Sequence, residues 1–155
     1  MTHTCTALVI GGGIAGPVAA MALQKAGIQA TVYEAYHSTA DGVGGGLSIA
    51  PNGLNALGVL GADESVRRVG IPMTAIVIHS WTGKQLAEFG SPPGLPSQQF
   101  VWRPDLYRAL HDEATRRGIH TEHGKRLAAV TDTGEAVTAH FTDGTQASAA
   151  CSGTC

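Results

Sequence analysis

The fold is decided near the start of the chain by the stretch Ala7-Leu8-Val9-Ile10-Gly11-Gly12-Gly13-Ile14-Ala15-Gly16. Its first residues are apolar and partly β-branched, which predicts a strand, and the adjacent glycines predict a turn. Small and apolar residues then recur at helical spacing as far as Gln24, and a second apolar run ends at the carboxylate of Glu34. The order strand, glycine turn, helix, strand predicts a βαβ unit over residues 6–34.

Three glycines have separate physical roles in such a unit. Gly11 lets the chain turn sharply away from the strand, Gly13 lets backbone N–H groups approach a pyrophosphate, and Gly16 lets the helix lie close to the sheet. A side chain at Gly13 is expected to obstruct both the turn and the phosphate. The helix N-terminus favours negative charge, and Glu34 offers an acceptor to the hydroxyls of an unphosphorylated ribose. The pattern therefore predicts dinucleotide binding.

The uncharged run of residues 5–23 has an alternative interpretation as a membrane span or a signal peptide. The glycine cluster would break a spanning helix in its middle. A signal peptide begins with a basic segment, whereas the first four residues of this chain include no Lys or Arg. We therefore expect a soluble, cytoplasmic protein that makes no use of a membrane.

Composition narrows the classes of partner. Ten Lys and Arg residues stand against twelve Asp and Glu residues, which gives a net charge of −2 and provides no electrostatic support for nucleic-acid binding. Only 14% of the residues are charged, against about 25% in a typical domain. Such a surface is expected to be covered by further chain or by a partner.

The cysteines and histidines suggest neither a disulfide framework nor a metal site. Cys5 lies in the first predicted strand, and Cys151 and Cys155 lie at the end of the chain, so a reducing compartment is favoured. His120 and His123 have the spacing closest to that of metal ligands, but on a strand their rings point to opposite faces. We expect no metal.

The rest of the chain divides into shorter patterns. A glycine-rich loop, a short strand and a helix are predicted over residues 42–61, and a hairpin over residues 74–90. A helix is predicted over residues 103–117, short strands over 120–150, and a divergent tail over 151–155.

Three motifs together resemble the N-terminal part of the FAD-dependent aromatic hydroxylases, the p-hydroxybenzoate hydroxylase-like monooxygenases. They are the glycine turn with Glu34, the segment Gly44–Gly53, and Arg103-Pro104-Asp105-Leu106. The resemblance extends to about Ala149. It implies an α/β fold in which a Rossmann-type FAD-binding βαβ domain carries an inserted antiparallel hairpin and sheet. It also implies a flavin that is reduced by NAD(P)H and inserts one oxygen atom of O₂ into an aromatic or polyketide-like substrate.

The resemblance also assigns roles to particular residues. It implies that the FAD pyrophosphate is held by Gly11, Gly13, Ala15 and Gly16, and the adenosine ribose by Glu34. Gly46 in the 42–61 segment is expected to border the flavin, and the 74–90 hairpin is expected to be of the substrate-domain type. Arg103 is expected near the ribityl and phosphate groups, with an ordinary surface arginine at a helix start as the alternative. The resemblance assigns no catalytic residue.

Two departures from the family pattern affect the predicted function. The family usually has a basic residue soon after the ribose-binding acid, but Ala35-Tyr36-His37 supplies none. The family's Gly-x-Asp-Gly segment is replaced by Ala149-Ala150-Cys151-Ser152-Gly153-Thr154-Cys155. We therefore expect a truncated FAD-binding domain that is inactive alone and depends on a missing C-terminal part or a partner. Two alternatives stay open: a non-catalytic nucleotide-binding remnant of a frameshifted gene, and an NAD-dependent oxidoreductase, because Glu34 suits NAD as well as FAD.

Overall fold

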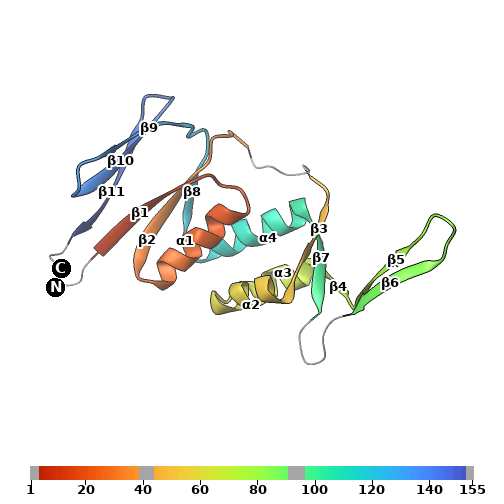
Figure 1. Cartoon of the computed structure of the whole chain (residues 1–155). Coiled ribbons are helices and arrows are strands. Elements are labelled where there is room, and N and C mark those ends of the chain that lie inside the picture. The colour runs from red at the N-terminus through yellow and green to blue at the C-terminus, as the bar shows by residue number, and fades with distance from the viewer. Residues whose placement is uncertain (1–3, 39–43, 91–96, 153–155) are drawn as a thin grey trace. The chain divides into compact units, whose positions relative to one another are not determined.

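The computed structural model describes residues 4–38, 44–90 and 97–152, and the chain divides into two compact units. Unit 1 is formed by Met1–Gly42 together with Tyr107–Cys155, and unit 2 by Val43–Leu106. The boundary between them falls within α4 (Arg103–Arg116). Figure 1 labels the elements of both units.

A six-stranded sheet forms the centre of unit 1 (Figure 1). Its strands, in spatial order, are β8 (His120–Glu122), β2 (Ile28–Tyr33), β1 (Thr4–Ile10), β11 (Gln146–Ser152), β10 (Ala136–Phe141) and β9 (Leu127–Asp132). The pairs β8–β2 and β2–β1 are parallel, whereas β11, β10 and β9 continue the sheet as antiparallel strands. Parallel neighbours need a crossover connection, and α1 (Ala15–Lys25) provides it between β1 and β2. The predicted βαβ unit and the α/β fold class are confirmed.

Unit 1 buries its apolar side chains in two places. One set lies on α1, on β2, on α4 and just after α4: Ala20, Met21, Val32, Leu110, Ala114 and Ile119. The other set is a cluster of Tyr33, Ala139 and Phe141, in which the two aromatic rings stack with their centroids 5.0 Å apart. The second cluster joins the parallel and antiparallel halves of the sheet.

The glycine turn after β1 has the sharp geometry that the sequence predicts. Gly11 adopts a φ of 102°, in the region that favours glycine, and its N–H donates to the carbonyl of Tyr33 at 2.8 Å. A Cβ at Gly16 would overlap the carbonyl oxygen of Gly11, whereas its nearest atom on the sheet, Val32 Cγ1, would be 3.5 Å away. The main role of Gly16 is therefore to let α1 start directly against the turn. Its effect on the distance between α1 and the sheet is smaller.

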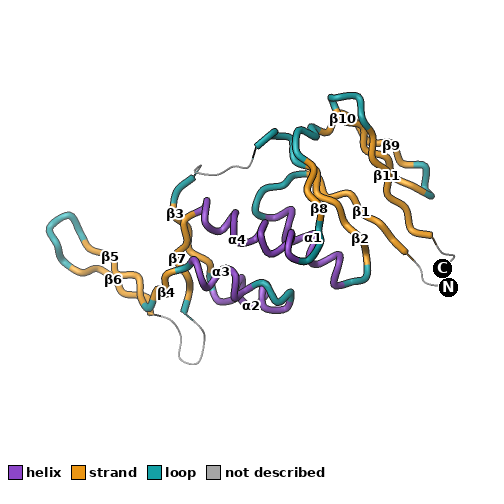
Figure 2. Tube along the Cα trace, turned by 180° about the vertical axis from the view of Figure 1, so that it is seen from behind, coloured by secondary structure: helices purple, strands orange, loops and turns teal. Residues whose placement is uncertain are grey.

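Unit 2 has its own small core. Its three-stranded antiparallel sheet has the order β3 (Gly46–Ile49), β7 (Gln98–Trp102) and β4 (Ile71–Met73). The helices α2 (Pro51–Val59) and α3 (Asp63–Val69) pack together. The buried apolar side chains of the unit include Leu54, Leu57, Ala62, Val66, Val101 and Leu106. The hairpin β5 (Ala75–His79) and β6 (Gln85–Gly90) continues from β4 as a separate two-stranded ribbon (Figure 2).

The structure differs from the sequence prediction at the C-terminal strand and at Cys5. β11 runs to Ser152, because its last residues pair with the start of β1, so Cys151 and Ser152 of the tail predicted over 151–155 lie in a strand; residues 153–155 lie outside the described ones. Cys5 is in a disulfide, although the cysteine spacing indicated none. The antiparallel register that places Cys5 opposite Cys151 along the backbone is not visible from the spacing.

None of the helices in the described part of the chain combines the length and the apolar character that crossing a membrane requires.

The C-terminal turn of α4 is tied by a buried carboxylate. Glu113 is 7% exposed and accepts hydrogen bonds from Arg116 Nε at 3.0 Å and from Arg117 Nε at 2.7 Å. Hydrogen bonding to Arg116 lowers the pKa of Glu113 from 4.5 to about 2, with Arg117 adding to the effect against the opposing cost of burial. The folded state therefore favours the ionised carboxylate.

We predict that Glu113→Gln lowers the free energy of unfolding at neutral pH by roughly 1–3 kcal/mol, since charge-assisted hydrogen bonds are lost. Because the pKa of Glu113 is depressed on folding, its stabilisation is complete above about pH 5 and disappears as the pH falls toward about 2. Urea unfolding of the parent and of Glu113→Gln at several pH values measures the two free energies of unfolding. The difference between them should shrink on acidification, and a difference that stays constant would contradict the assignment.

Candidate functional site

A groove of about 400 Å³ lies against the glycine turn of unit 1. It is lined by Val9, Ile10, Gly11, Gly13, Ile14, Ala15, Gly16 and Ala19. These residues form the carboxyl end of β1, the turn and the first part of α1. In open α/β sheets, ligands bind outside the carboxyl ends of the parallel strands, so the groove has the position of a ligand site.

The groove is suited to an anion. Within the described residues, no side chain caps the N-terminus of α1, and its first turn holds no acidic residue. The N–H groups of that turn are therefore available to a phosphate. A Cβ built at Gly13 has nothing within 4 Å, so the backbone there is open to a ligand. The expectation that a side chain at Gly13 obstructs the turn is wrong, because the space beside it is empty of protein atoms and Gly13 has no positive φ.

Glu34 follows β2 directly and is fixed beside the turn. Its Oε2 accepts a hydrogen bond from the Gly12 N–H at 2.6 Å, and its Oε1 accepts from the Tyr36 N–H at 2.9 Å. Its main chain is held as well, by the carbonyl of Glu122 at 2.8 Å and the N–H of Lys125 at 2.7 Å. Each carboxylate oxygen has two acceptor sites, so both retain capacity for a ligand hydroxyl.

Unit 1 thus brings together five of the residues that the sequence singled out. They are Gly11, Gly13, Ala15, Gly16 and Glu34, the first four in the lining of the groove and the fifth bonded to the turn. An open glycine turn at a helix N-terminus, beside a carboxylate at the end of β2, suits the pyrophosphate and adenosine ribose of a dinucleotide such as FAD.

Sequence reasoning missed His111, which lies on α4 and contacts the same turn. Its Nε2 is 2.6 Å from the carbonyl oxygen of Gly12, and its ring packs against Tyr107 with the centroids 4.1 Å apart. The two hydrogen-bonded residues are separated by 99 positions in the chain. No local pattern connects a helical histidine to a turn at that separation, so the sequence holds no signal for this contact.

Gly46 and Arg103 lie together in unit 2. Gly46 pairs with Trp102 across β3 and β7, and the ring of Phe100 occupies the space that a Cβ at Gly46 would need. The exposed Arg103 donates its backbone N–H to the carbonyl of Gly45 at 3.1 Å. Its Cδ lies 2.7 Å from the position of a Cβ on Gly44, so the arginine stem covers that glycine. Packing explains these glycines, and the roles of Gly46 and Arg103 toward a flavin stay predictions.

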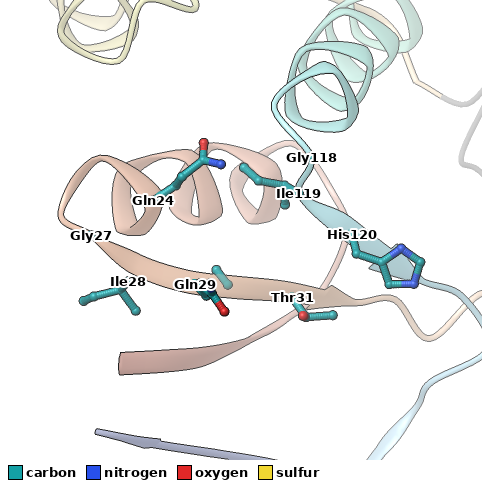
Figure 3. A pocket seen from close by; sticks show the side chains of 9 residues that line it. Gln24, Gly27, Ile28, Gln29, Thr31, Gly118, Ile119 and His120 are labelled. Carbon is teal, nitrogen blue, oxygen red and sulfur yellow. The ribbon is translucent and has the colours of Figure 1, made fainter. Parts of the chain in front are cut away.

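A second hollow, of about 480 Å³, lies elsewhere in unit 1 (Figure 3). Its lining comes from the end of α1, from β2 and from the start of β8, and includes Gln24, Thr31 and His120. Gln24 is already engaged, since its Nε2 donates to the carbonyl of Arg117 at 2.9 Å. The hollow includes Gly27 and Ile28, which lie at the amino end of β2. Unlike the groove, it therefore lies neither at the N-terminus of a helix nor at the carboxyl end of β2, where ligands of open α/β sheets bind.

The described residues contain no group of three or more His, Cys, Asp or Glu side chains that could hold a metal ion.

Comparison with known proteins agrees with the geometry of the groove. Residues 4–150 match a family model described as an FAD binding domain. The chain is 32% identical to the FAD-dependent urate hydroxylase of Klebsiella pneumoniae over 147 residues, which are 92% of this chain and 38% of that protein. It is 39% identical to the 3-amino-4-hydroxybenzoate 2-monooxygenase PtmB3 of Streptomyces platensis over 144 residues, which are 88% of this chain and 35% of that protein.

Solved structures show the same relation. The crystal structure of Klebsiella pneumoniae HpxO complexed with FAD and uric acid superposes with a TM-score of 0.81 at 31% identity, covering 92% of this chain and 36% of that one. The chain thus spans less than two fifths of the length of the relatives it matches. The match over residues 4–150 and the open glycine turn beside Glu34 lead to one conclusion: the chain belongs to the FAD binding domain family of flavoprotein monooxygenases.

Proposed function

We propose that this chain binds FAD as part of a flavin-dependent monooxygenase that uses NAD(P)H and O₂ to hydroxylate a small aromatic or polyketide-like substrate. The observation that carries the proposal is the open backbone at Gly13 beside the anchored carboxylate of Glu34, in a chain of this family. The relatives named for urate and for 3-amino-4-hydroxybenzoate support a small ring as substrate. When bound, FAD supplies the redox chemistry that activates O₂.

In this proposal the residues of unit 1 bind and orient the adenosine half of FAD. The pyrophosphate lies over the turn from Gly11 to Gly16, where the N-terminus of α1 stabilises its charge. Glu34 accepts hydrogen bonds from the ribose hydroxyls, and its charge repels a ribose that carries a 2′-phosphate. Gly46 borders the flavin, and Arg103 contacts the ribityl or phosphate groups.

The direct test is a titration of the purified chain with FAD and, separately, with NAD⁺. We expect FAD to bind and to change its absorbance and fluorescence, because the family is one of flavoproteins. Binding of NAD⁺ without binding of FAD would favour the alternative of an NAD-dependent oxidoreductase and overturn the proposal.

We predict that Glu34→Ala weakens FAD binding by about ten- to a hundredfold, since a charged acceptor contributes roughly 1.5–3 kcal/mol. Part of the loss comes from the Gly12 N–H, which also loses its acceptor. Fluorescence titration measures the affinity, and Glu135→Ala, at an exposed position between β9 and β10, is the matched control. Equal affinities of Glu34→Ala and the parent would refute the assignment of Glu34.

We predict that Gly13→Val abolishes FAD retention and leaves the melting temperature of the FAD-free chain nearly unchanged, because its side chain enters open space that the phosphate needs. Gly16→Ala is the contrasting variant. Its Cβ overlaps the Gly11 carbonyl, so it should lower the melting temperature as well as FAD binding. If Gly13→Val co-purifies with FAD at the parent's stoichiometry, the phosphates bind elsewhere.

We predict that Arg103→Ala lowers FAD affinity about tenfold, as expected for the loss of a charge-assisted contact to a phosphate. Arg103→Lys should recover only part of the affinity, because lysine lacks the planar fork of donors. Arg68→Ala, which removes an exposed arginine of α3 paired with Glu64, is the control. An unchanged affinity in Arg103→Ala would instead support an ordinary surface arginine.

A further inference from the structure

Gly12 is held from two sides by side chains of distant segments. Its N–H donates to Glu34 Oε2 at 2.6 Å, and its carbonyl oxygen lies 2.6 Å from Nε2 of His111. Glu34 follows β2, and His111 lies on α4, so the turn is fixed between the two. Both neighbours of Gly12 are glycines, whose backbones are the least restricted of all residues. The side chains therefore supply an order that the turn's own sequence does not.

We propose that His111 is a positioning residue for the FAD phosphates, a role that rests on the proposed function. A trans peptide is planar, and its C=O and N–H point in opposite directions. The Gly12 carbonyl faces His111 on α4, so the N–H of Gly13, in the same peptide, points away from α4. Gly13 lines the groove, and apart from Gly13 and its two chain neighbours no residue comes within 4 Å of its Cβ position. The hydrogen bond from His111 thus keeps a backbone donor directed at the place where the pyrophosphate binds.

The surroundings of His111 suit this role. A carbonyl oxygen only accepts, so Nε2 must carry the proton, in either the neutral or the charged imidazole. Tyr107, one helical turn earlier, is 5% exposed, and its ring lies at 30° to the imidazole. This ring contact holds the imidazole in the orientation in which Nε2 reaches Gly12. The hydrogen bond to Gly12 comes from Nε2, whereas the packing against Tyr107 comes from the whole ring. Mutations can therefore remove the donor and the ring one at a time.

The test compares two variants of the full chain with the parent. His111→Phe keeps a ring against Tyr107 and removes the donor, whereas His111→Gln keeps an N–H donor at a similar distance from the helix. We expect FAD affinity to fall about tenfold in His111→Phe and to be largely restored in His111→Gln. His140→Phe is the control, because it removes a histidine that hydrogen-bonds Thr131 at 2.9 Å, between β10 and β9.

Phosphorus NMR of the bound FAD distinguishes positioning from simple stabilisation. We expect the pyrophosphate resonances to shift in His111→Phe and to return toward the parent's in His111→Gln, whereas loss of stability alone would leave them in place. FAD binding by His111→Phe with parental affinity and resonances would overturn the role of His111 and leave the proposed function intact. A parent that binds no FAD would overturn both. If His111→Phe does not fold, His111→Leu, which also lacks the donor, takes its place: a tenfold loss that His111→Gln restores supports the role, and parental affinity and resonances in His111→Leu contradict it.

Discussion

The structure of unit 1 depends on the close approach of α1 to the turn that precedes it. Gly16 lies so near the carbonyl of Gly11 that no Cβ fits between them, and the helix therefore starts immediately after the strand has turned. This start places the N-terminus of α1 at the carboxyl end of β1 and leaves Gly13 uncovered. The same crossover delivers β2 as a parallel neighbour of β1, with Glu34 at its end. One steric constraint thus produces both the anion-binding end of the helix and the acceptor beside it.

Glu34 connects the fold with the proposed ligand. Its carboxylate accepts from the Gly12 and Tyr36 N–H groups, so it stabilises the turn through contacts within the chain. His111 holds the other side of Gly12, so the turn is fixed by protein groups on both sides. Preorganisation of this kind raises affinity, because the ordering of a flexible glycine segment does not have to be supplied by the ligand. Glu34 follows β2 and His111 lies on α4, so the contribution of each residue to the order of the turn can be measured with its own variant.

The two triple-glycine segments look alike in the sequence and serve different purposes in the structure. In the first, Gly13 borders empty space, which suits the close approach of a ligand. In the second, the Cβ position of Gly46 is occupied by the ring of Phe100, and that of Gly44 by the stem of Arg103. The second segment therefore needs glycine for packing against β7 and the start of α4. A glycine pattern alone does not distinguish an open backbone from a crowded one, since both exclude side chains.

The sequence by itself determined the βαβ unit, the sharp turn at Gly11 and the place of Glu34 at a strand end, because these follow from local periodicity and turn chemistry. It also indicated the β5–β6 hairpin from its turn residues. Only the tertiary structure decided that His111 reaches Gly12, that β11 pairs with β1 in a register that puts the backbone of Cys5 opposite that of Cys151, and that Phe100 fills the space at Gly46. All three contacts join segments that are far apart in the chain. The last of them also depends on the direction in which the ring of Phe100 points. Local patterns carry no information on them, because packing of the whole unit sets the register and the distance.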